Sequence, residues 1–303
     1  MTLGADAAKI LAVATIQRSP SLPATLRLGG VHLTVTDVDR AIAWYERALG
    51  LQLTHREGDT AVLGTEGDEL ITLVADPDAQ QRGRHAGLYH YALLYPSRAE
   101  LARAAIRLAA TRTPIQGASD HGTHEAIYLP DADGNGIELA ADRPRDQWPE
   151  VGSRDFYTGG PQPLDVDALL AVVDGEQPRA QAEPGLRVGH LHLHVGDVDE
   201  GLAFYSDVVG FDLIARLPSA AFVSAGGYHH HLGFNVWRGE GVPPAPAEHV
   251  VGLRHWTVLL PSDEDAAALR ERLETTGHRV EVSDGGFIVR DPWNNALLVT
   301  RAN

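Results

Sequence analysis

A glutamate and a large set of histidines are the residues of this sequence that could do chemistry. Glu138 lies in a short apolar run that follows a turn of Asp, Gly and Asn residues (131–136), and this pattern reads as a strand. A carboxylate at a core position is costly unless a second group pairs with it or it binds something. The chain also has 15 histidines, several of them clustered, and imidazoles exchange protons near neutral pH and coordinate metals. For this segment alone a simpler interpretation stays open, in which the strand alternates and Glu138 faces water.

The elements that would position these residues recur along the chain. Residues 29–50 and 189–210 match in register, and each copy reads as a strand, an Asp-Val-Asp helix start, a helix rich in aromatic residues and a closing glycine. The aspartate is a good N-cap and the glycine a good helix stop. Residues 87–97 and 252–262 form a second matching pair, and each leads into a helix, a turn and a strand. The segments between them alternate in the manner of strands.

These repeats predict an α+β fold of four βαβββ modules. One module cannot bury its sheet face alone, so we expect two modules to close a curved sheet into a cup, and four modules to give two cups. The stretch between the second and third modules is rich in Pro, Gly, Asp and Gln, with one short helix predicted at 165–173. The predicted division is an N-terminal arm (1–26), module 1 (27–76), module 2 (86–143), a linker (144–186), module 3 (187–238) and module 4 (250–303).

Composition excludes several classes of protein. A net charge of -16 argues against a nucleic-acid partner, because phosphates repel such a surface. The absence of cysteine excludes disulfides and thiolate chemistry. No apolar run approaches the ~20 residues of a membrane span, and the N-terminal arm lacks the features of a signal peptide. We therefore expect a cytoplasmic globular protein without membrane contacts, and unpaired sheet edges favour a homo-oligomer.

The repeated module, the D-V-D helix start with its F/W-Y pair, and the strand motif D-x-D-G-N-x-I-E resemble the vicinal oxygen chelate superfamily. This superfamily includes glyoxalases, fosfomycin- and bleomycin-resistance proteins and type I extradiol dioxygenases. The resemblance covers residues 27–143 and 187–303, and four modules in one chain is the layout of the extradiol dioxygenases. It implies that one of the two glyoxalase-like cups bears a divalent metal, usually Fe(II), although Mn(II) favours the same ligands.

The resemblance implies His90, Glu138 and His190 as the metal ligands. In the family, the first-strand histidine lies seven residues before the residue that opens the helix, and this spacing leads to His90 in module 2 and His190 in module 3. Module 1 has Gly30 at this position, while module 4 has His255 but a leucine in place of the last-strand glutamate. Modules 2 and 3 therefore supply the whole set, and we expect module 2 to pair with module 3 and module 1 with module 4.

A second pairing stays open. If module 1 pairs with module 2, His32 would replace His190 as a ligand, because His32 lies two residues beyond Gly30 on the same face of its strand.

Four further residues are implied to take part in catalysis. Extradiol enzymes use a tyrosine ten residues before the metal-binding glutamate, which is Tyr128 here, and an acid/base histidine that aligns with His230. His121 and His124 would assist as hydrogen-bond donors close to the metal ligands. Within the run of three histidines, we expect His229 and its neighbour on the far side of His230 to point away and to serve the structure.

The leading hypothesis is an Fe(II)-dependent extradiol dioxygenase that cleaves a small aromatic diol with O2. Two imidazoles and one carboxylate suit a non-haem iron that keeps positions open for substrate and oxygen. The alternatives are a metalloenzyme of the glyoxalase or thiol-transferase type, or a metal-free protein that sequesters a ligand. The identity of the catechol and the position of cleavage are not encoded in any motif of the sequence.

Overall fold

The computed structural model describes residues 21–149 and 160–302, so most of the expected N-terminal arm lies outside the described residues. The strands and helices alternate along the chain in the repeating order that the sequence predicts, and the expected α+β class is confirmed. The elements up to residue 149 are β1 (Arg27–Leu28), β2 (Val31–Val35), α1 (Val38–Leu49), β3 (Gln52–Glu57), β4 (Thr60–Thr65), β5 (Asp68–Ala75), β6 (Gly87–Tyr95), α2 (Arg98–Ala110), β7 (Gly117–Asp120), β8 (His124–Pro130), β9 (Gly136–Asp142) and η1 (Arg145–Gln147).

The second described stretch begins with the end of the predicted linker. The short helix expected at 165–173 is present there as α3 followed by a single 3-10 turn. The elements from residue 160 onward are β10 (Gln162–Pro163), α3 (Val166–Leu170), η2 (Ala171–Val173), β11 (Arg187–His194), α4 (Val198–Leu202), η3 (Ala203–Val208), β12 (Asp212–Leu217), β13 (Ala220–Ser224), β14 (Leu232–Asn235), β15 (Gly252–Leu260), α5 (Asp263–Thr275), β16 (Val280–Ser283), β17 (Gly286–Arg290) and β18 (Ala296–Arg301).

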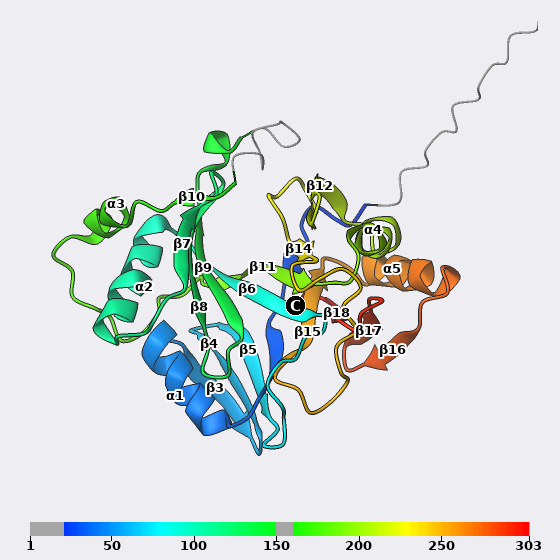
Figure 1. Cartoon of the computed structure of the whole chain (residues 1–303), viewed down its shortest axis with the longest axis horizontal. Coiled ribbons are helices and arrows are strands. Elements are labelled where there is room, and N and C mark those ends of the chain that lie inside the picture. Colours follow the sequence, from blue (N-terminus) through cyan, green and yellow to red (C-terminus); the bar gives the residue numbers. More distant parts are fainter. Residues whose placement is uncertain (1–20, 150–159, 303) are drawn as a thin grey trace, which may run out of the picture.

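The strands form two nine-stranded sheets. One runs β16-β17-β18-β15-β2-β5-β4-β3, with β1 beside β15, and the other runs β10-β7-β8-β9-β6-β11-β14-β13-β12. Figure 1 shows α1 and α2 on one flank of the molecule and α4 and α5 on the opposite flank, with the central strands β6, β11 and β15 between them. Each half of a sheet therefore comes from a different part of the sequence.

The pairing of the sheets agrees with the pairing inferred from the ligand positions. Strand β6 of module 2 runs antiparallel to β11 of module 3, and β2 of module 1 runs antiparallel to β15 of module 4. The alternative pairing of modules 1 and 2 is therefore wrong. His32 lies in the other sheet, where its ring stacks on His255 at a centroid distance of 3.9 Å.

The helix signals read from the sequence act as expected. The side chain of Asp37 accepts a hydrogen bond from the Arg40 amide at the start of α1, and Gly50 ends this helix with a φ of 72°. In the matching copy, Asp197 caps α4 in the same way. The second copy differs in one respect, because the π-helix η3 continues α4. The match between residues 29–50 and 189–210 does not predict this change of helix type.

A second set of contacts joins the modules in the opposite combination. Tyr45 on α1 donates a hydrogen bond to Asp131 Oδ2 in the turn between β8 and β9, at 2.8 Å. Tyr205 on η3 donates in the same way to Asp291 Oδ2 in the turn between β17 and β18, at 2.9 Å. These tyrosines are buried and tie module 1 to module 2 and module 3 to module 4, whereas the sheets tie 2 to 3 and 1 to 4. The four modules thus form a closed cycle of contacts.

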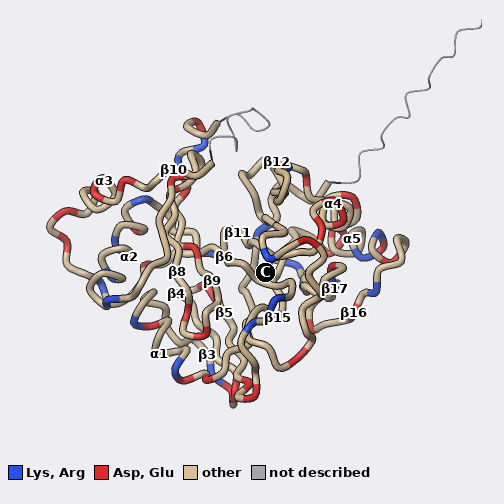
Figure 2. The backbone as a smooth tube through the Cα atoms, in the orientation of Figure 1, with Lys and Arg blue, Asp and Glu red and all other residues tan. Residues whose placement is uncertain are grey.

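Residues of both charges occur along the backbone in both halves of the molecule, as the colours of Figure 2 show. Among the described residues, no helix has both the length and the apolar character needed to cross a membrane. The sheets end at β3 and β16 in one case and at β10 and β12 in the other. Self-association through such edges and a cytoplasmic location stay predictions.

The stacked pair of His32 and His255, in the second cup that modules 1 and 4 form, should make the stability of the protein depend on pH. Burial lowers the pKa of His255 from 6.5 to about 3 and that of His32 to about 4. Between these values and 6.5 the unfolded chain binds protons that the folded chain does not, so the free energy of unfolding should fall as the pH drops from 6.5 towards 4. Replacing His255→Gln should reduce this dependence by up to about 1.4 kcal/mol per pH unit, one proton's worth. Urea unfolding at pH 7, 6 and 5 measures it, and an unchanged slope would contradict the assignment.

Candidate metal centre and active-site cavity

The central strands bring the three predicted ligands onto one face of the sheet. Ala92 on β6 pairs with His190 on β11 at one side and with Glu138 on β9 at the other. Paired residues on neighbouring strands point to the same face, and so does His90, which precedes Ala92 by two residues. The small side chain of Ala92 therefore lies between the three functional groups. This register is what the pairing of modules 2 and 3 provides.

The three side chains meet at the carboxylate. His90 Nε2 lies 3.1 Å from Glu138 Oε2, and His190 Nε2 lies 3.2 Å from the same oxygen. One ligand atom from each of these residues lies within 4.8 Å of the others. All three are buried, with exposed fractions of 7% for His90 and 1% for each of the other two. Two imidazoles and one carboxylate on one face are a donor set that a divalent metal such as Fe(II) or Mn(II) takes up.

The details of the contacts fit a shared cation better than a set of hydrogen bonds. His90 Nε2 and Glu138 Oε1 are buried, and although each lies 3.1 Å from an atom of a neighbouring side chain, neither makes a contact with hydrogen-bond geometry among the described residues. Buried polar atoms without hydrogen bonds are rare, and a bound ion is one recognised explanation for them. The short distances to Glu138 together with these unsatisfied atoms indicate that the donors point towards a common position. The residues present therefore fit a metal of this class.

Electrostatics favour the ionised form of the Glu138 carboxylate and the neutral form of the His190 imidazole. Burial alone would raise the pKa of Glu138, but the imidazoles of His190, His124 and His90 outweigh it and hold that pKa well below its usual range. Burial lowers the pKa of His190, although Glu138 opposes the shift. A neutral imidazole and an ionised carboxylate are the forms that bind a cation.

His124 approaches the other side of the carboxylate. Its Nε2 lies 3.1 Å from Glu138 Oε1, and its ring stacks on His121 at 4.5 Å. His121 Nε2 is 2.7 Å from the hydroxyl of Tyr128, which pairs directly with Glu138 across β8 and β9. Burial lowers the pKa of His121 to about 4, and burial followed by the charge of Glu138 raises the pKa of Tyr128 well above its usual value. Tyr128 therefore keeps its proton and can donate it in a hydrogen bond.

A cavity of about 480 Å³ opens beside this group. Its polar lining includes His90, Glu138, His124, Tyr128 and His230, and its apolar lining includes Ile137, Leu217, Phe222 and Trp237. None of the described residues that line it is Lys or Arg. This volume and this mixture of apolar walls with a few convergent polar groups are typical of small-molecule sites.

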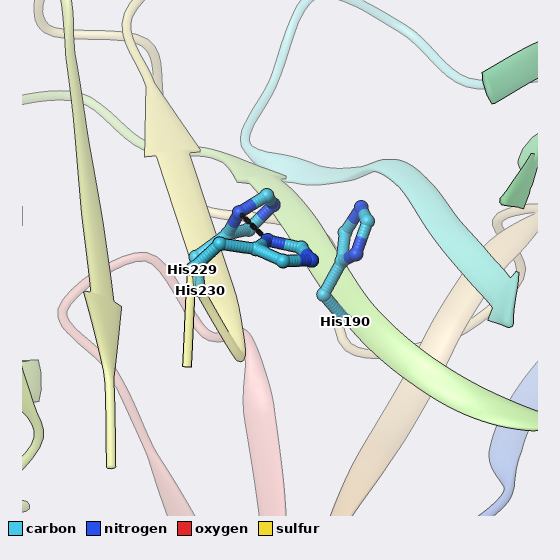
Figure 3. A group of neighbouring side chains, drawn as sticks. All are labelled: His190, His229 and His230. Atoms are coloured by element: carbon cyan, nitrogen blue, oxygen red, sulfur yellow. Dashed lines mark hydrogen bonds between the residues drawn. The ribbon is translucent and has the colours of Figure 1, made fainter. Parts of the chain in front are cut away.

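The structure brings His230 to the cavity and corrects the expectation for its neighbour. The His230 ring lies 4.1 Å from that of His190, and Figure 3 shows the two facing one another. We expected His229 to point away, on the assumption of an alternating strand. Strand β14 begins only at Leu232, so the histidines before it lie in a turn where alternation does not apply. His229 Nδ1 instead lies 2.9 Å from His230 Nδ1.

Two more cavity residues escaped the sequence analysis. Tyr89 and Trp237 line the cavity, and their rings meet edge to face at 5.3 Å, with Trp237 52% exposed. Tyr89 lies in β6 directly before His90, but no spacing rule marks it. The identity of the residue before a first-strand histidine would have been the signal to examine.

Comparison with known proteins places the chain in a family. The model of the Glyoxalase/Bleomycin resistance protein/Dioxygenase superfamily matches residues 27–139 and 187–299. The chain belongs to this superfamily, which confirms the resemblance drawn from its motifs. It is 37% identical over 276 residues to the catechol-2,3-dioxygenase of Bacillus subtilis strain 168, a match that covers 89% of this chain and 95% of the relative.

Solved structures share the fold. Glyoxalase I from Zea mays superposes with a TM-score of 0.56 at 15% identity, covering 91% of this chain and 92% of that one. The cppA protein from Streptococcus pneumoniae superposes with a TM-score of 0.55 at 16% identity, covering 91% of this chain and all (100%) of that one. These likenesses support the two-cup architecture and carry no information about the reaction.

Loss of any ligand should abolish metal retention. We expect His90→Ala, Glu138→Ala and His190→Ala proteins to bind less than a tenth of the Fe(II) or Mn(II) that the unaltered protein holds, because two donors cannot enclose the ion. His192→Gln is the matched control, since His192 is buried in the same cavity and pairs with His90 across β6 and β11. Metal analysis after desalting measures this. Loss of metal from His192→Gln with retention in His90→Ala would mean that the ligand set is wrong.

Proposed function

We propose that this chain is an extradiol ring-cleaving dioxygenase that inserts O2 into a catechol-type aromatic. The observation that carries the proposal is the group formed by His90, Glu138 and His190, which lies beside a cavity of a size typical of small-molecule sites. The 37% identity to a catechol-2,3-dioxygenase over most of both chains supports the same reaction. Fe(II) is the metal we favour, with Mn(II) as the second choice, because both accept this donor set.

The metal would be held by His90, Glu138 and His190, and when bound it would supply a site at which a diol and O2 react together. Proton transfer and substrate positioning would depend on side chains of the protein. His230 is placed to accept a proton from a substrate hydroxyl, since burial lowers its pKa and leaves the ring neutral. Tyr128 is placed to donate a hydrogen bond to the substrate oxygen.

The surrounding side chains would hold and shield the aromatic ring. Phe222 lies edge-on to His230 at 5.1 Å and to His192 at 5.6 Å, so its ring forms one wall beside the proposed base. Trp237 and Ile137 provide further apolar surface. Such walls exclude water, which strengthens the hydrogen bonds of Tyr128 and His230 with the substrate.

Oxygen uptake tests the reaction. Protein loaded anaerobically with Fe(II) and mixed with a panel of catechols should consume one O2 per catechol and form a yellow ring-opened product when air is admitted. His230→Gln should retain metal but lose about 10²–10⁴-fold in kcat, the usual contribution of a general base. No oxygen uptake with any catechol, from protein that holds its metal, would reject the proposal.

The charge of the cavity should select among catechols. The described lining contains no Lys or Arg, so a carboxylate on the ring substituent of the substrate would be buried without a partner. We expect 3,4-dihydroxyphenylacetate to be cleaved with a kcat/KM at least about tenfold lower than its methyl ester, which has the same ring and no charge. Equal kcat/KM values for the acid and the ester would contradict this reading of the cavity.

A further inference from the structure

We propose that Asp142 and His229 are positioning residues that fix His230 in one tautomer, with its proton on Nδ1 and a bare Nε2 available as the base. The inference rests on the proposed function for its catalytic consequence, although the tautomer itself can be measured without turnover. It goes beyond the ligands and the base, because it assigns a task to the buried His229 and to Asp142, whose side chain is 23% exposed.

A line of hydrogen bonds leads from the cavity into the protein. His230 Nδ1 lies 2.9 Å from His229 Nδ1, and His229 Nε2 lies 3.1 Å from Asp142 Oδ1. Figure 3 shows the first of these contacts as the two rings meet beside His190. His229 and His230 are 1% and 5% exposed, so water does not compete for these nitrogens.

The far end of this line is an acceptor held in place by another donor. The hydroxyl of Tyr228 donates to both oxygens of Asp142, at 3.2 Å and 3.0 Å. Asp142 is the last residue of β9, four positions beyond Glu138 on the same strand. The strand that carries the proposed metal ligand therefore also carries the group that orients the proposed base.

Proton bookkeeping along the line gives the tautomer. A carboxylate has no proton to give, so His229 must donate from Nε2 to Asp142. A neutral imidazole has one N–H, so His229 Nδ1 is then an acceptor, and His230 must donate to it from its own Nδ1. His230, with its only proton used in this way, has a bare Nε2. Both rings are buried, and an apolar, water-free environment favours the uncharged form of an imidazole.

The alternative arrangement of protons is chemically useless for a base. If the line ran the other way, His230 Nδ1 would accept from His229 and its proton would be on Nε2. A ring with its proton on Nε2 can donate there but cannot take a proton from a substrate hydroxyl. The Asp142 carboxylate, acting through His229, therefore determines whether His230 Nε2 can act as a base.

Exchange of this carboxylate for an amide is the sharpest test. Asp142→Asn keeps the size of the side chain but can present an N–H to His229, which would reverse every bond in the line. We expect kcat to fall about 10²–10⁴-fold with KM and metal content little changed, the signature of a base held in the wrong tautomer. Asp212→Asn, the same chemical change at an exposed residue of module 3, is the matched control and should leave kcat unaltered.

The tautomer can be read directly. Imidazole ¹⁵N–¹H correlation spectra of the full-length protein, labelled at histidine and loaded with diamagnetic Zn(II), report which nitrogen carries each proton. The His230 signal is assigned as the one missing from His230→Gln. We expect N–H at Nδ1 in the unaltered protein and at Nε2 in Asp142→Asn. N–H at Nε2 in the unaltered protein, or an Asp142→Asn protein with unchanged tautomer and kcat, would overturn the proposal.

A second pair of variants covers the case in which Asp142→Asn does not fold. His229→Asn can still accept from His230 Nδ1 through its amide oxygen, whereas His229→Ala cannot. We expect kcat in His229→Asn to exceed that in His229→Ala by at least about tenfold, and equal values would count against the inference. If the unaltered protein cleaves no catechol at all, the proposed function fails, and the spectra still decide the tautomer.

Discussion

The burial of one carboxylate is the constraint on which this structure depends. Glu138 is 1% exposed at the centre of a nine-stranded sheet, where an isolated charge would cost several kcal/mol. The imidazoles of His90, His124 and His190 surround it at 3.1–3.2 Å and keep it ionised. Hydrogen bonds and contacts with imidazoles offset only part of the cost of burying a carboxylate. A bound cation would complete the compensation, so the residues that are costly for the stability of the fold are also the residues proposed to form its site.

Repetition of one module makes this arrangement possible. Sheet pairing joins modules 2 and 3 across β6 and β11, and the buried contact between Tyr45 and Asp131 holds module 2 against module 1. The corresponding contact of Tyr205 holds module 3 against module 4. Because each module contacts two others through different surfaces, the register of β6 on β11 is fixed from both sides. A slip of one residue there would turn His190 away from Glu138.

Much of this could be predicted from the sequence, because repeats reveal register. The Asp-Val-Asp helix start gave the position of His190, and the absence of a donor at Gly30 gave the pairing of the modules. The failures are local. The orientation of His229 was predicted wrongly, because the two-residue alternation of a strand was extended into the segment before β14. The π-helix η3 was not predicted, because the matching sequence of α1 gives no indication of it. Asp142 gave no signal at all, since its partners lie 86 and 87 residues away along the chain.

The second cup shows what the same module becomes without the charge. Leu298 stands where the other cup has Glu138, so no carboxylate needs compensation there. A Cβ at Gly30 would lie 3.1 Å from the Leu70 carbonyl oxygen, so a histidine could not enter that position unless β5 moved. His32 and His255 remain, but they stack on each other at 3.9 Å with lowered pKa values. Two imidazoles without an acid form a packing contact. The difference between the two cups therefore lies in the glutamate more than in the histidines, since only the buried carboxylate carries a charge that a bound cation would compensate.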